Sequence, residues 1–351
     1  GKRVFVAMGR VKGKAVCFTI GAYGVFTEHK ARERAQSILQ GMREGVDPRD
    51  VQKQDEAARV TLSTVADAYK ERPGKLKDSS TKVIERHVAT TFAAWKDKPI
   101  VSITEDDVRK RYREMLTKGL RGNGGAPGQA NQAFAVLRAL INFASRRYKR
   151  ADGSSLILHN PVEALKDDWV QLKPRTSRIP DTKVGTVWAA LREWQTTAHT
   201  PETRASVDLT MFLLLTGCRL EEGSSLTWDR VNLEEGWFHL PDPKNRNPVW
   251  LPLSTQAVEL LRERKRVDGN PHVFASWSKA GHIIDPRDVR KKVGTVAGTP
   301  ITNHDLRRTY TTIGIAHCGI DYYKVELLTN HIPSGVTAKH YLETSRLQYL
   351  R

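Results

Sequence analysis

The stretch MFLLLTGCRLEEGSS, residues 211–225, decides how the rest of this chain is interpreted. It begins with an apolar run typical of a buried helix, and Gly217 supplies the residue type that most often ends one. Arg219 follows, and Glu222 stands three positions later, where a helix would place both side chains on one face. A single arginine after a helix end is usually a surface charge or a cap, so its meaning depends on the neighbouring motifs.

Two segments downstream add further basic side chains. PDPKNRNP, residues 241–248, is a polar turn between two β-rich stretches; it exposes Lys244, with Arg246 as the alternative. NHDLRRTYTT, residues 303–312, places His304 and Arg307 three positions apart, which puts them on the same face of a predicted helix.

A fourth segment, LLTNHIPSGVTAKHYLE, residues 327–343, contributes His331 and Tyr341. Each of the four segments alone is ordinary. Together, two arginines, a lysine and two histidines suit a phosphate group that gains charge in a transition state. A tyrosine hydroxyl is a plausible nucleophile toward phosphorus in such a cationic site.

In order and spacing, these segments resemble the tyrosine recombinase (phage integrase) family over about residues 205–345. The family has an arginine in a TG-x-R-x-x-E context, a lysine on a β-hairpin, a His-x-x-Arg motif, a second histidine and a nucleophilic tyrosine. The resemblance implies a DNA strand-transferase whose catalytic residues are Arg219, Lys244, His304, Arg307, His331 and Tyr341.

The resemblance also implies a role for each side chain. The two arginines clamp the nonbridging oxygens of the scissile phosphate, and the two histidines hydrogen-bond the phosphate and assist proton transfer. Lys244 acts as general acid toward the departing 5′ oxygen, and Tyr341 attacks to form a 3′-phosphotyrosyl link. Glu222 orients the first arginine or a histidine.

The fourth segment departs from the common family pattern. Many members have Leu-Gly-His and nine residues to the tyrosine, whereas this chain has Thr329-Asn330-His331 and ten residues to Tyr341. The extra residue falls in a predicted turn before the helix. Tyr349 is the rival nucleophile, but it lies outside the GVTAKHY match, which favours Tyr341.

Composition points to a polyanionic partner. The 351 residues carry 57 Lys+Arg against 39 Asp+Glu, a formal net charge of +18, which favours a nucleic acid. No apolar run approaches the ~20 residues of a membrane span. Three widely separated cysteines argue against a zinc module or a disulfide framework. We therefore expect a cytoplasmic, nucleoid-associated protein without membrane contact.

The sequence divides into three regions and predicts a mainly α, α+β multidomain fold. Residues 1–45 read as a β-hairpin (runs 2–8 and 15–20, joined by GRVKGK) followed by a helix. Residues 46–60 are a polar linker, 61–158 a helical bundle, and 159–180 a second linker rich in Pro, Lys and Asp. Residues 181–351 form a mostly helical catalytic domain with a small antiparallel sheet, including helices expected at 304–318 and 336–349.

The first two regions resemble family modules more weakly. The bundle is similar to a core-binding domain, and the hairpin plus helix is similar to an arm-type DNA-binding module whose sheet enters a DNA groove. That resemblance implies DNA contacts from four basic side chains, Arg3, Arg10, Lys12 and Lys14, although each could equally be an ordinary solvated charge.

The predicted reaction is isoenergetic strand exchange that integrates or excises a mobile element such as a prophage. The covalent intermediate conserves the bond energy, so no ATP, metal or other cofactor is expected. The expected partners are double-stranded attachment sites, three further copies of the chain in a tetramer on DNA, and a host DNA-bending protein as an accessory factor. A type IB topoisomerase and a non-catalytic DNA-binding regulator are the alternatives.

Overall fold

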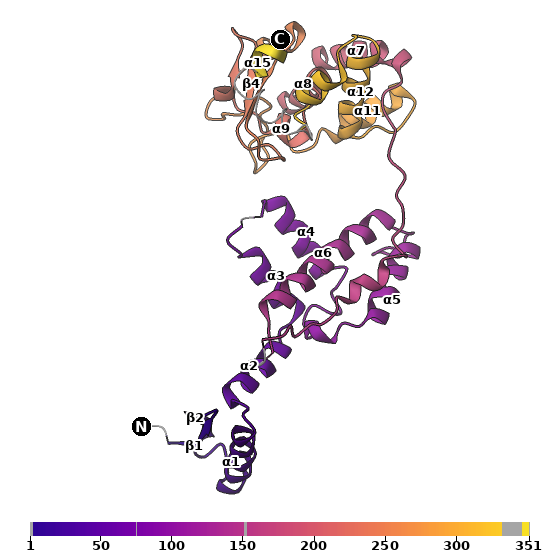
Figure 1. Ribbon diagram of the computed structural model, residues 1–351. Coiled ribbons are helices and arrows are strands. Elements are labelled where there is room, and N and C mark those ends of the chain that lie inside the picture. Colours follow the sequence, from indigo (N-terminus) through magenta and orange to yellow (C-terminus); the bar gives the residue numbers. More distant parts are fainter. Residues whose placement is uncertain (1–2, 75, 151–152, 332–345, 351) are drawn as a thin grey trace. The chain divides into compact units, whose positions relative to one another are not determined.

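The structure is a computed structural model that describes residues 3–74, 76–150, 153–331 and 346–350 (Figure 1). The chain forms two compact units, Gly1–Lys173 and Pro174–Arg351. Both are mostly helical with small antiparallel sheets, which confirms the predicted fold class. None of the helices in the described ranges is long and apolar enough to cross a membrane.

The first unit opens with the predicted hairpin and helix. Strands β1 (Val4–Val11) and β2 (Lys14–Ala22) pair antiparallel, and α1 (Glu28–Arg43) packs on one face of the pair. The strands are longer than expected because the turn needs only Lys12 and Gly13, whose φ angles of 48° and 82° allow a two-residue connection.

The segment 46–60, expected to be an irregular linker, contains helix α2 (Pro48–Ala58). It has little apolar periodicity because most of its residues face solvent. Its start signal is nevertheless present, since the Asp47 side chain accepts a hydrogen bond from the Arg49 N–H and Pro48 occupies the first turn.

The helical bundle comprises α3 (Leu62–Lys70), α4 (Asp78–Ala89), the short 3₁₀ turn η1 (Ile100–Ser102), α5 (Glu105–Thr117) and α6 (Pro127–Arg147). The predicted capping box of Thr104 and Asp107 starts α5. The apolar face of α6 is buried as predicted, through Phe134, Leu137, Ile141 and Ala144.

The start of the second expected linker belongs to the bundle instead. Residues 161–165 form a 3₁₀ turn, η2 (Pro161–Leu165), which packs on α5 and α6. Its Val162 and Leu165 are buried in the bundle core, and the Asn160 side chain caps the turn. The spacing of Val162 and Leu165, three residues apart, is that of a 3₁₀ helix, but the surrounding proline and charged residues made the stretch look like a linker.

The second unit surrounds a buried central helix, α8 (Pro201–Thr216), which is contacted by α7 (Asp181–Thr196), α10 (Thr255–Arg262), α11 (Arg287–Ala297) and α12 (Asn303–Ala316). The remaining described elements are α9 (Leu220–Ser224), η3 (Trp228–Arg230), α13 (Tyr322–Leu328) and α15 (Arg346–Leu350).

A three-stranded sheet completes this unit, in the order β3 (Val231–Asn232), β4 (Trp237–Leu240) and β5 (Val249–Pro252). Helix α15 packs against β5, and its Leu350 is buried in the core of the same unit. The rest of the helix expected at 336–349 lies outside the described residues.

Candidate active site

Arg219 is placed by the end of α8. Gly217 adopts φ 61°, which ends that helix, and a Cβ there would lie 2.3 Å from the Tyr310 ring. Arg219 then begins α9 and makes two contacts with Glu222: its backbone N–H donates to Oε2 at 2.9 Å, and its Nη1 donates to Oε1 at 2.9 Å. Because Glu222 holds both main chain and guanidinium, it fixes the direction in which Arg219 points.

Helix α12 supplies the second arginine. Thr302 and Asp305 form a capping box at its start, and that sets the orientation of the turn carrying His304 and Arg307. Arg307 is only 3% exposed. Its Nη1 donates to the Gly217 carbonyl at 2.9 Å, so the guanidinium reaches the same chain reversal that places Arg219.

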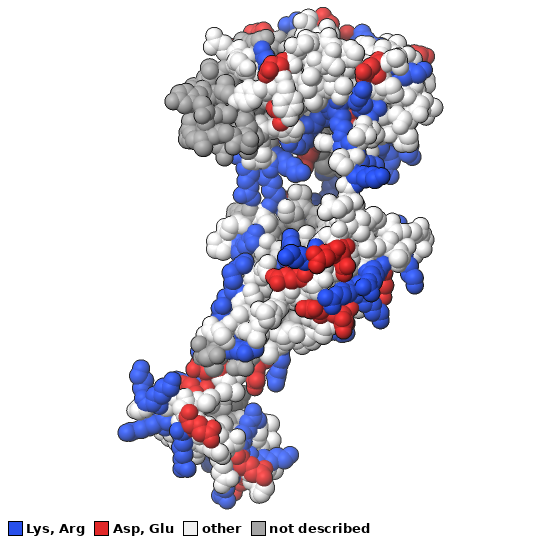
Figure 2. Space-filling model, turned by 45° about the vertical axis from the view of Figure 1, so that its right-hand side comes forward, with Lys and Arg blue, Asp and Glu red and all other residues white. Residues whose placement is uncertain are grey.

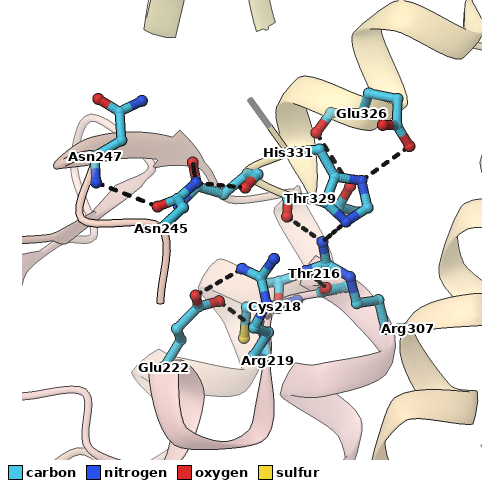
Figure 3. Close-up of polar contacts among 12 residues, drawn as sticks. Thr216, Cys218, Arg219, Glu222, Asn245, Asn247, Arg307, Glu326, Thr329 and His331 are labelled. Atoms are coloured by element: carbon cyan, nitrogen blue, oxygen red, sulfur yellow. Dashed lines mark hydrogen bonds and ion pairs between the residues drawn. The ribbon is translucent and has the colours of Figure 1, made fainter. Parts of the chain in front are cut away.

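The other side of Arg307 binds the segment after α13. Its Nη2 donates to the Thr329 carbonyl and lies 2.9 Å from Nε2 of His331 (Figure 3). Nδ1 of His331 lies 2.9 Å from Oε1 of Glu326. A proton on Nδ1, donated to Glu326, leaves Nε2 as the ring atom that faces the arginine.

The electrostatics of the site are dominated by positive charge. Burial and then the nearby Arg219 guanidinium lower the pKa of Arg307, Glu222 and Glu326 act in the opposite direction, and the net result is a pKa of about 10. His304 also has a lowered pKa, because of burial and then the charges of Arg308, Arg307 and Arg219. A bound anion would relieve this repulsion, so the arrangement suits a phosphate group.

The hairpin lysine stands at the edge of this cluster. Lys244 is exposed in the turn between β4 and β5, and Arg246, the alternative, adopts φ 57° in the same turn. The next residue, Asn245, donates from Nδ2 to the Asn330 carbonyl at 2.9 Å. This contact brings the turn beside the segment that carries His331.

The expected nucleophile, Tyr341, lies outside the described residues. Its rival Tyr349 lies in α15 with its side chain partly exposed, and the Lys324 ammonium is 5.4 Å from its ring centroid. The four basic residues proposed for arm-type contacts are all exposed, and they lie in the first unit, on or beside the hairpin: Arg3, Arg10, Lys12 and Lys14.

Sequence reasoning predicted Glu222 as a supporting group but missed the others. Glu326 precedes His331 by five positions and shows no motif, and Asn245 is one polar residue among several in the turn that carries Lys244. The carbonyls of Gly217 and Thr329 have no side-chain signal at all. Among the described residues, no group of His, Cys, Asp and Glu could hold a metal ion.

The family match and the fold define the class of protein: a DNA recombinase that uses a tyrosine. Residues 188–347 match the model of the phage integrase family. This match and the similarity to prophage integrases support a tyrosine recombinase. They do not favour the topoisomerase or the non-catalytic regulator.

The chain is similar to the prophage integrase IntF of Escherichia coli (strain K12), with 24% identity over 97% of this chain and 78% of the relative. It is similar in fold to a lambda integrase dimer bound to a COC′ core site, with a TM-score of 0.57 and 16% identity over 99% of this chain and 92% of that one. A lambda integrase tetramer bound to a Holliday junction gives a TM-score of 0.57 and 16% identity over 92% of each chain.

Proposed function

We propose that this recombinase binds the scissile phosphate between Arg219, Arg307 and His331 and breaks the DNA strand with Tyr341. The observation that carries the proposal is the convergence of Arg307 on both the Gly217 carbonyl and His331, because it joins three of the sequence motifs at one point. The family match supplies the reaction class, and the contacts of Arg219, Arg307 and His331 support their proposed part in binding the phosphate.

The phosphate-binding step follows from charge and geometry. Arg219 and Arg307 each present N–H donors, and their mutual repulsion is relieved when the nonbridging oxygens enter between them. Nε2 of His331 faces the same place and adds a third donor when it carries a proton of its own, while Nδ1 donates to Glu326 behind the ring.

The chemical step transfers the phosphoryl group from O5′ to the phenol oxygen. Tyr341 gives its proton to a base, attacks phosphorus, and the P–O5′ bond breaks. His304 suits the base, since its lowered pKa keeps the imidazole neutral at neutral pH. Lys244 gives a proton to the departing O5′, which leaves as a 5′-hydroxyl, and attack by a partner strand's 5′-hydroxyl reverses these steps.

The biological reaction proposed is integration and excision of a mobile element, such as a prophage, at double-stranded attachment sites. Strand exchange between two duplexes needs one active site per strand, hence a homotetramer on DNA, an arrangement seen for the lambda integrase tetramer on a Holliday junction. A host DNA-bending protein is a further proposed partner, and the protein is proposed to work in the cytoplasm.

The N-terminal module is proposed to bind a second, arm-type DNA sequence. Lys and Arg side chains gather on this module at the foot of Figure 2. The outward face of its hairpin carries Val6, Met8 and Arg10, with Cys17 directly across from Met8. Apolar side chains on a basic ribbon suit a major groove, where they can contact thymine methyl groups.

A suicide-substrate assay tests the proposed function. Nicked duplexes with a randomised crossover region are incubated with the full-length protein, and covalent adducts are captured and sequenced. We expect adducts on one family of sequences with wild-type protein, none with Tyr341→Phe, and none with Arg219→Ala. Adducts on unrelated sequences would indicate a topoisomerase, no adducts a non-catalytic regulator, and persistence in Tyr341→Phe another nucleophile.

A further inference from the structure

The turn between β4 and β5 is fastened to the active site by one side chain. Nδ2 of Asn245 donates to the Asn330 carbonyl at 2.9 Å and approaches Oδ1 of Asn330 at 3.3 Å. Oδ1 of Asn245 accepts from the Asn247 backbone N–H at 3.2 Å. The same amide therefore closes its own turn and bridges 85 positions of sequence (Figure 3).

The receiving segment is the centre of the phosphate-binding cluster. The Thr329 carbonyl accepts from Arg307, and the His331 ring lies against the same guanidinium. Asn330 stands between them with φ 53°, a left-handed conformation that turns its carbonyl toward the hairpin. The three consecutive residues 329–331 thus contact, in order, Arg307, the hairpin turn and Glu326.

We propose that Asn245 is a positioning residue for proton transfer to the leaving oxygen. The inference rests on the proposed role of Lys244 as general acid. Lys244 is exposed on a flexible four-carbon stem, so the position of its backbone decides which region its ammonium can reach. The bridge from Asn245 to Asn330 fixes that backbone relative to the arginine and histidine that hold the phosphate, and so fixes the distance over which the proton moves.

The side chain at position 245 must carry both a hydrogen-bond donor and a hydrogen-bond acceptor, at the distance from the backbone that asparagine provides. Aspartate keeps the acceptor for the Asn247 N–H but loses the donor to Asn330, and alanine loses both. At Asn330 the demand is different, because the 2.9 Å bond uses its carbonyl rather than its side chain. Glycine at 330 therefore keeps the bridge and accepts the positive φ.

The test compares two leaving groups on the same full-length protein. One suicide duplex carries the selected crossover sequence with a normal phosphodiester, and the other has sulfur in place of the bridging 5′ oxygen. The P–S bond breaks to a thiolate that needs no proton, so a defect in the general acid or its placement disappears on this substrate. The measurement is the single-turnover rate of covalent adduct formation.

We expect Asn245→Ala and Asn245→Asp to slow cleavage of the normal substrate by about 10- to 100-fold, which is at most the lower end of the roughly 100- to 10,000-fold effect of a general acid. Both should recover to within about threefold of wild type on the sulfur substrate, as should Lys244→Ala. The matched control, Asn247→Ala, keeps its backbone N–H and should stay within about twofold on both substrates.

The possible results distinguish failure of the positioning role of Asn245 from failure of the proposed recombinase function. Recovery of Lys244→Ala without recovery of Asn245→Ala would show that Asn245 has a merely structural role, and a normal rate for Asn245→Ala would overturn the proposal directly. If neither variant recovers, Lys244 is not the general acid and the inference falls with it. Absence of adduct with wild-type protein on both substrates would refute the proposed function itself.

Discussion

Arg307 is predicted to stabilise the fold as well as the transition state, whereas Arg219 contributes mainly to chemistry. Arg307→Ala removes the donors to two buried carbonyls, those of Gly217 and Thr329. A buried acceptor left without its donor costs about 1–3 kcal/mol. The two together would cost about 2–6 kcal/mol.

Two effects reduce that cost. Removing the guanidinium abolishes its own burial penalty and its repulsion with Arg219, the two causes of its lowered pKa. We therefore expect a net loss of about 2–4 kcal/mol, toward the low end of the range for broken buried charge networks. At roughly 2–4 °C per kcal/mol for a unit of this size, the melting temperature should fall by about 4–16 °C.

The matched control is Arg219→Ala. Its side chain is 25% exposed, and its loss frees Glu222 while relieving the repulsion with Arg307. The two effects oppose each other, so we expect a change within about 1 kcal/mol. Both variants should abolish covalent adduct formation.

The assay is thermal unfolding followed by tryptophan fluorescence, since six of the eight tryptophans lie in the catalytic unit. The prediction requires a clear separation between the two variants. An Arg307→Ala protein that melts within 2 °C of wild type, or an Arg219→Ala protein that loses as much as Arg307→Ala, would refute the reasoning.

Three further predictions concern a helix end, a titrating group and the hairpin. Gly217→Ala should lower the free energy of unfolding by about 2–4 kcal/mol, because residue 217 is left-handed and its new Cβ would lie 2.3 Å from the Tyr310 ring. The control Gly298→Ala has the same backbone strain (φ 73°) but open space around the Cβ, so it should cost only about 1–2 kcal/mol, and similar melting temperatures for the two variants would contradict this. The pKa of His304 lies below its ordinary 6.5, so the cleavage rate and the stability should both stay constant down to pH 6.5 and fall only in more acidic buffer. His304→Gln should lack this titration, and an unchanged pH profile in the variant would argue against His304 as the general base. Alkylation of the exposed Cys17 should slow on selected arm-type DNA while that of Cys318 is unaffected, as followed by mass spectrometry; equal rates with and without DNA would exclude the hairpin face as the contact.

The sequence predicted those elements whose determinants are local. The capping box of Thr104 and Asp107 and the buried face of α6 depend on residues within one or two turns, so they could be recognised directly. Where local signals were weak, the sequence did not reveal the element: α2 is marked by its Asp-Pro start rather than by periodicity, and η2 contributes only two apolar side chains to the bundle core.

Within the site, the sequence by itself determined which side chains carry charge and in what order. Its motifs were enough to indicate the tyrosine recombinase family. Only the tertiary structure decided what holds them: the carbonyls that bind Arg307, Glu326 behind His331, and the amide bridge from Asn245 to Asn330. These contacts join residues up to 90 positions apart, and those of Arg307 and Asn245 end on main-chain carbonyls that every residue possesses. Local patterns cannot encode them, because they exist only once the helices and the hairpin have packed together.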